Sequence, residues 1–68
     1  MEGLVVCEFK VLLEGQVVAE DVVYARDEGG AVVLRSIIGR EVRVGNCRIV
    51  EVDSVRERLV LAREAGNS

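Results

Sequence analysis

The stretch Val5-Val6-Cys7-Glu8-Phe9-Lys10-Val11 carries the clearest fold signal in this chain of 68 residues. Apolar and charged residues alternate in it, and the alternating pattern extends over residues 4–14. Because successive side chains of a β-strand point to opposite faces, a period of two predicts a half-buried strand. The residues that this pattern assigns to the buried face are Cys7, Phe9, Val11 and Leu13.

Similar short runs follow along the rest of the chain, separated by turn-forming residues. Glu14-Gly15 predicts a tight hairpin turn, and Asp27-Glu28-Gly29-Gly30 is the clearest turn in the sequence. Gly39 predicts a bend, Gly45-Asn46 predicts the end of a strand, and Asp53-Ser54 predicts a further turn. The strands predicted between these turns cover residues 16–20, 21–26, 31–37, 40–44, 47–52 and 56–62.

Two of these segments allow alternatives. Within residues 47–52 the apolar positions change phase, which predicts either a β-bulge or a strand buried on both faces. Residues 54–62 could instead form a helix, with Ser54 as the N-cap and Glu57 completing a capping box. The apolar run Leu59-Val60-Leu61 is short, however, and a strand is favoured.

The strand pattern predicts an all-β fold, namely a small six- to seven-stranded antiparallel barrel or sandwich, SH3-like or Sm-like in size. Fifteen of the residues are valine, whose branched side chain packs well on a pleated sheet. We expect a single domain over residues 1–68, with a frayed polar tail at residues 65–68. Because so short a chain has a small core, we also expect self-association through a sheet edge or an apolar face.

The charge balance argues against a dedicated nucleic-acid-binding protein. The net charge is −3 and the pI is about 4.9, whereas phosphate-binding proteins normally present a basic face. A local basic patch built from Arg40, Arg43 and Arg48 remains the alternative, as an RNA-binding module. No signal peptide or membrane-spanning run is visible, and we expect a cytoplasmic protein with reduced thiols.

The two cysteines are the candidate chemical groups. The chain has no histidine, so any soft-metal or redox chemistry must use the thiolate of Cys7 or Cys47. A thiolate near the start of the chain suits nickel or copper, which complete a square plane with deprotonated backbone nitrogens. Two copies across a dimer axis would supply two such sulfurs. Free cysteines are, however, often small buried hydrophobes.

The sequence predicts that the chain is not an enzyme. Without histidine, neither a Ser-His-Asp nor a Cys-His arrangement can form. The Gly29-Gly30 pair lacks the lysine and hydroxyl residue of a phosphate-binding loop. The adjacent carboxylates Glu20-Asp21 point to opposite faces if they lie on a strand, so they do not converge on one proton.

Several short motifs follow one another along the chain, namely Cys7-Glu8-x-Lys10-Val11, Glu20-Asp21-Val22, Gly30-x-Val32-x-Leu34, Ile37-Ile38-Gly39 and Ile49-Val50-Glu51-Val52-Asp53. Their order, from Cys7 to about Leu61, resembles the CooT family, small proteins also described as predicted RNA-binding proteins. The resemblance implies a compact β-rich homodimer. In its nickel-binding members, a cysteine directly after the initiator methionine binds Ni(II), and these members accompany the maturation of nickel-dependent carbon monoxide dehydrogenase. The matching position here is Cys7.

The chain departs from this family pattern at its start, because Cys7 follows six residues rather than one. Valine can be encoded by GTG, which also serves as a start codon. We therefore hypothesise that the native chain begins at Val6, read as methionine, and that residues 1–5 come from a wrongly chosen start. A third possibility is a metal-free interaction domain with both cysteines in its core.

Overall fold

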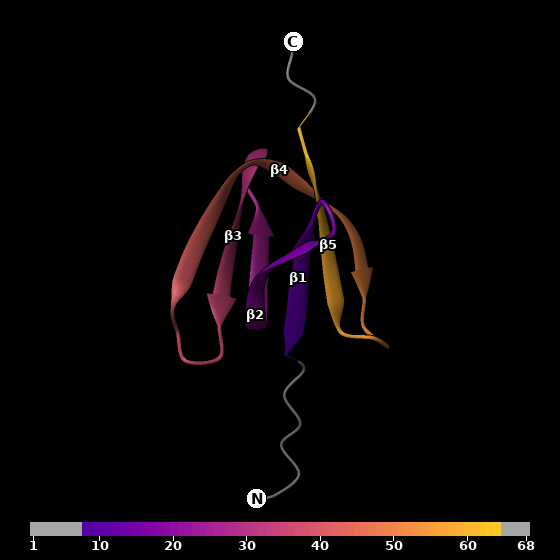
Figure 1. Cartoon of the computed structure of the whole chain (residues 1–68). Helices are drawn as coiled ribbons and strands as arrows, with labels where there is room; N and C mark the ends of the chain where they lie inside the picture. The colour runs from indigo at the N-terminus through magenta and orange to yellow at the C-terminus, as the bar shows by residue number, and fades with distance from the viewer. Residues whose placement is uncertain (1–7, 65–68) are drawn as a thin grey trace, which may run out of the picture.

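The computed structural model describes residues 8–64, and all of the regular structure in this range is β-strand (Figure 1). The prediction of an all-β fold is therefore confirmed. Within these residues we find no helix with the length and apolar character needed to cross a membrane. The strands are β1 (Phe9–Leu13), β2 (Gln16–Asp27), β3 (Gly30–Ser36), β4 (Glu41–Asp53) and β5 (Arg58–Arg63).

The five strands form one sheet that closes on itself in the order β1-β2-β3-β4-β5. Four of the five pairings are antiparallel, and β5 pairs back to β1 in parallel, with Lys10 opposite Arg58 and Leu13 opposite Leu61. A closed ring with an odd number of strands cannot alternate direction throughout, so one parallel pair is a geometric necessity. Each strand consequently has a neighbour on both sides.

The prediction of six to seven strands is wrong, because two predicted breaks are bulges inside long strands. Asp21 (φ 58°) lies within β2, and Asn46 (φ 57°) lies within β4. The pairing of β1 with β2 shifts between Phe9 and Val11, and that of β3 with β4 shifts between Gly30 and Ala31. An extra residue in the left-handed region bends a strand without ending it, which explains why these polar positions look like turns in the sequence.

Two alternatives in the second half are decided by the structure. The phase change predicted in residues 47–52 is a bulge, since Ile49 pairs with Leu61 but Glu51 pairs with Val60. The helical alternative for residues 54–62 is wrong. The Asp53 carboxylate accepts hydrogen bonds from the Val55 and Arg56 backbone N–H groups, both at 3.1 Å, and this closes a turn that leads into β5.

The other predicted turns are present. Glu14 (φ 54°) and Gly15 (φ 77°) form the two-residue turn between β1 and β2, with the positive φ angles of a type I′ hairpin. Residues 27–30 connect β2 to β3, and Gly39 (φ 88°) lies in the bend before β4. The predicted residues 4–7 of the first strand and the polar tail at 65–68 lie outside the described residues.

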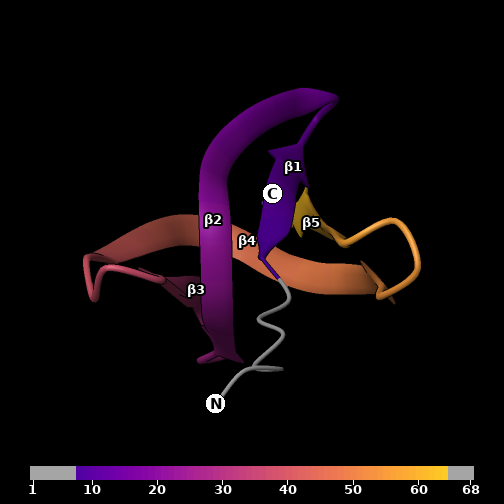
Figure 2. The same ribbon diagram turned by 90° about the horizontal axis from the view of Figure 1, so that it is seen from below.

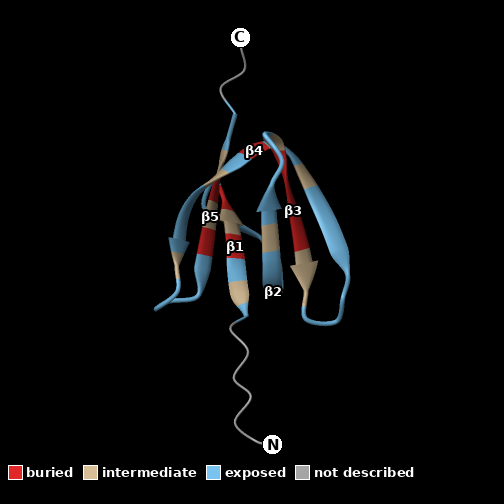
Figure 3. Cartoon of the chain, turned by 180° about the vertical axis from the view of Figure 1, so that it is seen from behind, coloured by how far each residue is buried: buried red, intermediate tan, exposed pale blue. Residues whose placement is uncertain are grey.

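The core lies inside the closed sheet and draws on every strand. Figure 3 shows the buried segments of β1, β3, β4 and β5 in red. The alternation predicted for the first strand is confirmed in its described part, because Val11 and Leu13 are buried while Lys10 is exposed. Strand β3 is the most completely covered, with four consecutive buried residues from Ala31 to Leu34. The buried cluster comprises Val11, Leu13, Val22, Val32, Leu34, Cys47, Leu59 and Leu61.

Candidate functional site

Cys7, the predicted metal ligand, lies outside the described residues. The next residue, Glu8, is exposed, and β1 starts at Phe9. The end of the closed sheet at which β1 and β5 begin is here called the basal end. Figure 1 shows the turns β3–β4 and β4–β5 at this same end, and Figure 2 views the molecule from that side. The part of the sheet that adjoins Cys7 in sequence is therefore the basal end.

An apolar hollow of about 240 Å³ extends from Phe9 and Leu59, near the basal end, to Ala25 and Ile49 farther along the sheet. Its wall combines the first residue of β1 with residues of β2, β4 and β5 that are distant in sequence. Nothing in the sequence pattern predicts this hollow, because its residues come from four strands and alternate between core and surface. They include Phe9, Val22, Tyr24, Ile49, Val52 and Leu59.

A second hollow beside it is polar, with a volume of about 290 Å³. It lies where the start of β1 meets the turn before β5, and the Lys10 backbone N–H donates to the Glu57 carbonyl oxygen at 2.9 Å. Three basic and two acidic side chains line it, so its charges almost balance. The lining residues are Glu8, Lys10, Arg56, Glu57 and Arg58.

Cys47, the other thiol, is a core residue. It has no exposed surface and packs in the buried cluster, and its thiol donates a hydrogen bond to the Val44 carbonyl oxygen with an Sγ···O distance of 3.3 Å. Burial raises the pKa of the Cys47 thiol, because a thiolate is costly away from water. The structure thus gives Cys47 the role of a small buried hydrophobe.

Of the three arginines of the RNA-binding alternative, two lie on β4 and one lies in the turn before it, each beside different neighbours. Arg40 precedes β4 at the β3–β4 turn, Arg43 lies opposite Val33 of β3, and Arg48 lies opposite Ala62 of β5. The Arg43 guanidinium forms an ion pair with Glu28. Arg48 Nη1 donates to the Arg63 carbonyl oxygen at 3.4 Å. The strand pairing therefore does not gather the three side chains into one basic cluster.

The outer face of β2, β3 and β4 carries a polar network that sequence reasoning missed. The Glu28 carboxylate pairs with Arg26 at 2.7 Å and also with Arg43, and the two guanidiniums lower the pKa of Glu28, Arg26 most strongly. Arg26 Nη1 donates to the Tyr24 hydroxyl at 3.1 Å, and the Arg35 guanidinium lies 4.5 Å from the centre of the Tyr24 ring. This face is mixed in charge rather than basic.

A metal site built only from described residues is absent. Within residues 8–64, no three or more His, Cys, Asp or Glu side chains are grouped closely enough to hold a metal ion. Cys47 could not join such a group without leaving the core. Cys7, the other thiol of the sequence, lies outside this range.

Comparison with known proteins gives one family. The sequence model of the family described as CO dehydrogenase accessory protein CooT matches residues 6–62. The match thus covers Cys7 and all of β1 to β4, and it ends one residue before the end of β5. No curated protein matches the chain.

Proposed function

The chain belongs to the CooT family, and on this basis we propose that it is a nickel-enzyme accessory protein, a homodimer that binds Ni(II) through the Cys7 thiolate. The family description supports an accessory role beside CO dehydrogenase. It names a helper protein and not a catalyst, in keeping with the prediction that the chain is not an enzyme. Nickel is in this proposal a cargo for another protein.

The choice of Cys7 rests on the burial of Cys47. With no histidine in the chain and Cys47 sealed in the core, Cys7 is the thiol left to act as a soft ligand. The family match includes Cys7 as its second residue. This is the position at which the resemblance places the nickel ligand.

The proposed site uses the chemistry of a soft donor close to backbone amides. A thiolate and deprotonated backbone nitrogens together suit a square-planar Ni(II) ion. Pairing of two subunits would bring two Cys7 sulfurs to one ion. Binding requires the thiolate, so it should release protons and weaken as the pH falls.

Titration calorimetry of the reduced full-length chain with Ni(II) tests this proposal. We expect Cys7→Ser to lose nickel binding and Cys47→Ala to keep it, provided circular dichroism shows that both variants are folded. Metal ligands usually contribute so strongly that loss of the only sulfur should lower the affinity by at least about 100-fold. Unchanged affinity in Cys7→Ser would exclude Cys7 as the ligand. No binding by the unaltered chain would favour a metal-free interaction domain.

We further propose that the native chain begins at Val6, read as methionine. The family match begins at this same residue, which supports the idea. Such a start would place the chain's amino group within one or two residues of the Cys7 sulfur. The intact mass of the protein purified from its own source tests the proposal, and a mass that includes residues 1–5 would refute it. Nickel titration of a chain that starts at position 6 shows whether the amine contributes to binding.

A further inference from the structure

The basal end carries exposed aliphatic side chains, one of them in the wall of the apolar hollow and others in the two turns, which lie at opposite sides of the molecule (Figure 2). Val52 lines the apolar hollow and is 62% exposed, and Val55 in the following turn is 91% exposed. The β3–β4 turn at the same end carries Ile38, which is 83% exposed (Figure 1). Exposed aliphatic side chains beside an apolar hollow are typical of a surface that another molecule covers.

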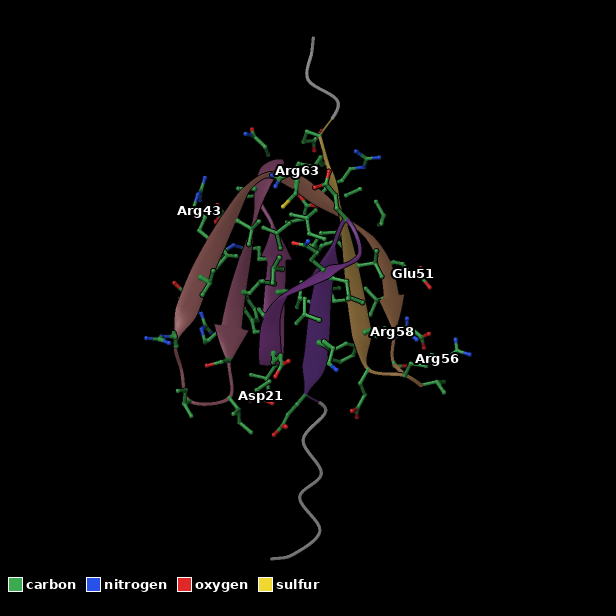
Figure 4. All side chains as sticks on the ribbon, in the orientation of Figure 1. Asp21, Arg43, Glu51, Arg56, Arg58 and Arg63 are labelled. Carbon is green, nitrogen blue, oxygen red and sulfur yellow. The ribbon has the colours of Figure 1, made fainter. Side chains whose placement is uncertain are left out.

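The polar margin of this end carries both signs of charge. Lys10, Arg56 and Arg58 lie beside Glu8 and Glu57 around the polar hollow. Arg56 also reaches the Asp53 carboxylate, with Nη1 3.4 Å from Oδ2. Figure 4 shows Arg56 and Arg58 at the basal end with Asp21, while Arg63 lies at the opposite end. An apolar centre with a charged margin is the usual anatomy of a protein–protein interface.

The closed sheet restricts how this chain can associate. Each of the five strands pairs with two neighbours, but β2 and β4 change partner midway, so the edges that stay unpaired are only half a strand long. Of the two routes expected from the sequence, a sheet edge and an apolar face, the basal end offers the second. Val52 is the most exposed of the residues that line the apolar hollow.

We propose that the basal end is the face through which two copies of this chain pair, an inference that rests on the homodimer in the proposed function. A two-fold interface places the same surface on both partners, so the surface has to be complementary to itself. The nearly balanced margin satisfies this condition, since Lys10, Arg56 and Arg58 can face Glu8 and Glu57 of the other copy. A margin of one sign would repel its copy and would suit a different partner.

Substitution of a charge into the apolar centre tests the proposed face. We expect Val52→Glu to raise the dimer dissociation constant by about 100-fold or more, because it buries an unpaired carboxylate on each side of the interface. The matched control is Val17→Glu, an exposed valine of β2 beside the β1–β2 turn at the other end, and it should leave the dissociation constant unchanged. Sedimentation equilibrium gives the dimer dissociation constant of the unaltered full chain and of the Val52→Glu and Val17→Glu variants.

A second variant is needed because Val52→Glu could also weaken the dimer by disturbing the fold. Val55 lies in a turn and is 91% exposed, so Val55→Glu should leave the fold intact and still weaken the dimer. Full dimerisation of both Val52→Glu and Val55→Glu would overturn the proposed face while leaving the homodimer standing. A monomeric unaltered chain would overturn the face and the homodimer together. Nickel titration of the same proteins reports separately on Cys7, so failure of the face and failure of the nickel site are distinguishable.

Discussion

The Asp27 carboxylate joins the end of β2 to the middle of β4, accepting a hydrogen bond from the Ile49 backbone N–H at 3.1 Å. Its other oxygen accepts from the Gly29 N–H at 2.9 Å. Ile49 follows the point at which β4 leaves β3, since the pairing of these two strands ends at Cys47. Asp27 therefore supplies a hydrogen-bond acceptor that β3 no longer provides there.

We predict that Asp27 makes the free energy of unfolding decrease as the pH falls into the acidic range. The hydrogen bonds from Gly29 and Ile49 lower the pKa of Asp27 below its ordinary value of 3.8. A carboxyl whose pKa is lower in the folded state stabilises the protein above its unfolded pKa. That stabilisation is lost as the pH falls through the folded pKa, below about pH 4.

Urea denaturation of Asp27→Asn measures this effect. The variant should have a lower free energy of unfolding at neutral pH, and its stability should fall less steeply on acidification. Some acid dependence should remain, because Arg26 and Arg43 also lower the pKa of Glu28. The control is Glu51→Gln, which removes an exposed carboxylate from β4. Equal acid profiles for Asp27→Asn and the unaltered chain would contradict the prediction.

We predict that Cys47 does not react with a thiol reagent while the chain is folded. It has no exposed surface, and burial raises the pKa of its thiol. Labelling Cys7→Ser with a disulfide reagent should give no modified thiol in native buffer and one in denaturant. Labelling of this variant at the same rate in both conditions would show that Cys47 is not sealed in the core.

We predict that Asn46 stabilises the protein through its backbone conformation and not through its side chain. With φ at 57°, it occupies the left-handed region, where β-branched residues are strongly disfavoured. Asn46→Val should lower the free energy of unfolding by roughly 1–2 kcal/mol, whereas Asn46→Gly should change it little. Thermal or urea denaturation of the pair distinguishes backbone strain from loss of the side chain. Equal losses in both variants would assign the effect to the side chain.

We predict weak binding of RNA. The chain has a net charge of −3, and Glu28 pairs with Arg43, the middle arginine of the predicted RNA-binding set. Because phosphate contacts by unpaired basic groups supply most non-specific affinity, binding of a short single-stranded RNA should be weaker than about 10⁻⁴ M even at low salt. Fluorescence anisotropy checks this. Tighter binding that falls steeply with salt and is lost in Arg40→Ala and Arg48→Ala would restore the RNA-binding alternative.

The strand pattern is readable from the sequence because it is local. The alternation through Phe9, Val11 and Leu13 and the Glu14-Gly15 turn each depend on neighbouring residues only. Asp21 and Asn46 are different, because a polar residue in the left-handed region occurs both in turns and in bulges. Whether the strand ends there depends on a partner strand that continues the pairing, and the local sequence does not contain that information.

Some features of the candidate site are likewise predictable from the local sequence, and others are not. Cys7 is identified by its order among short motifs, and the core position of Cys47 agrees with the ordinary habit of free cysteines. The apolar hollow is not predictable, because Phe9, Tyr24 and Val52 meet only after the sheet has closed. The bond between Asp27 and Ile49 likewise links residues that are 22 positions apart.

The parallel pairing of β1 with β5 makes the first and last strands of the chain immediate neighbours. During synthesis, β1 leaves the ribosome first and stays without one of its two partners until β5 has emerged. The ring can therefore close only after β5 has been synthesised. The parallel direction also separates Phe9 from Arg63 by a strand length, roughly 18 Å, so the whole segment that joins β5 to β1 in a circular permutant has to run from one end of the sheet to the other (Figure 1).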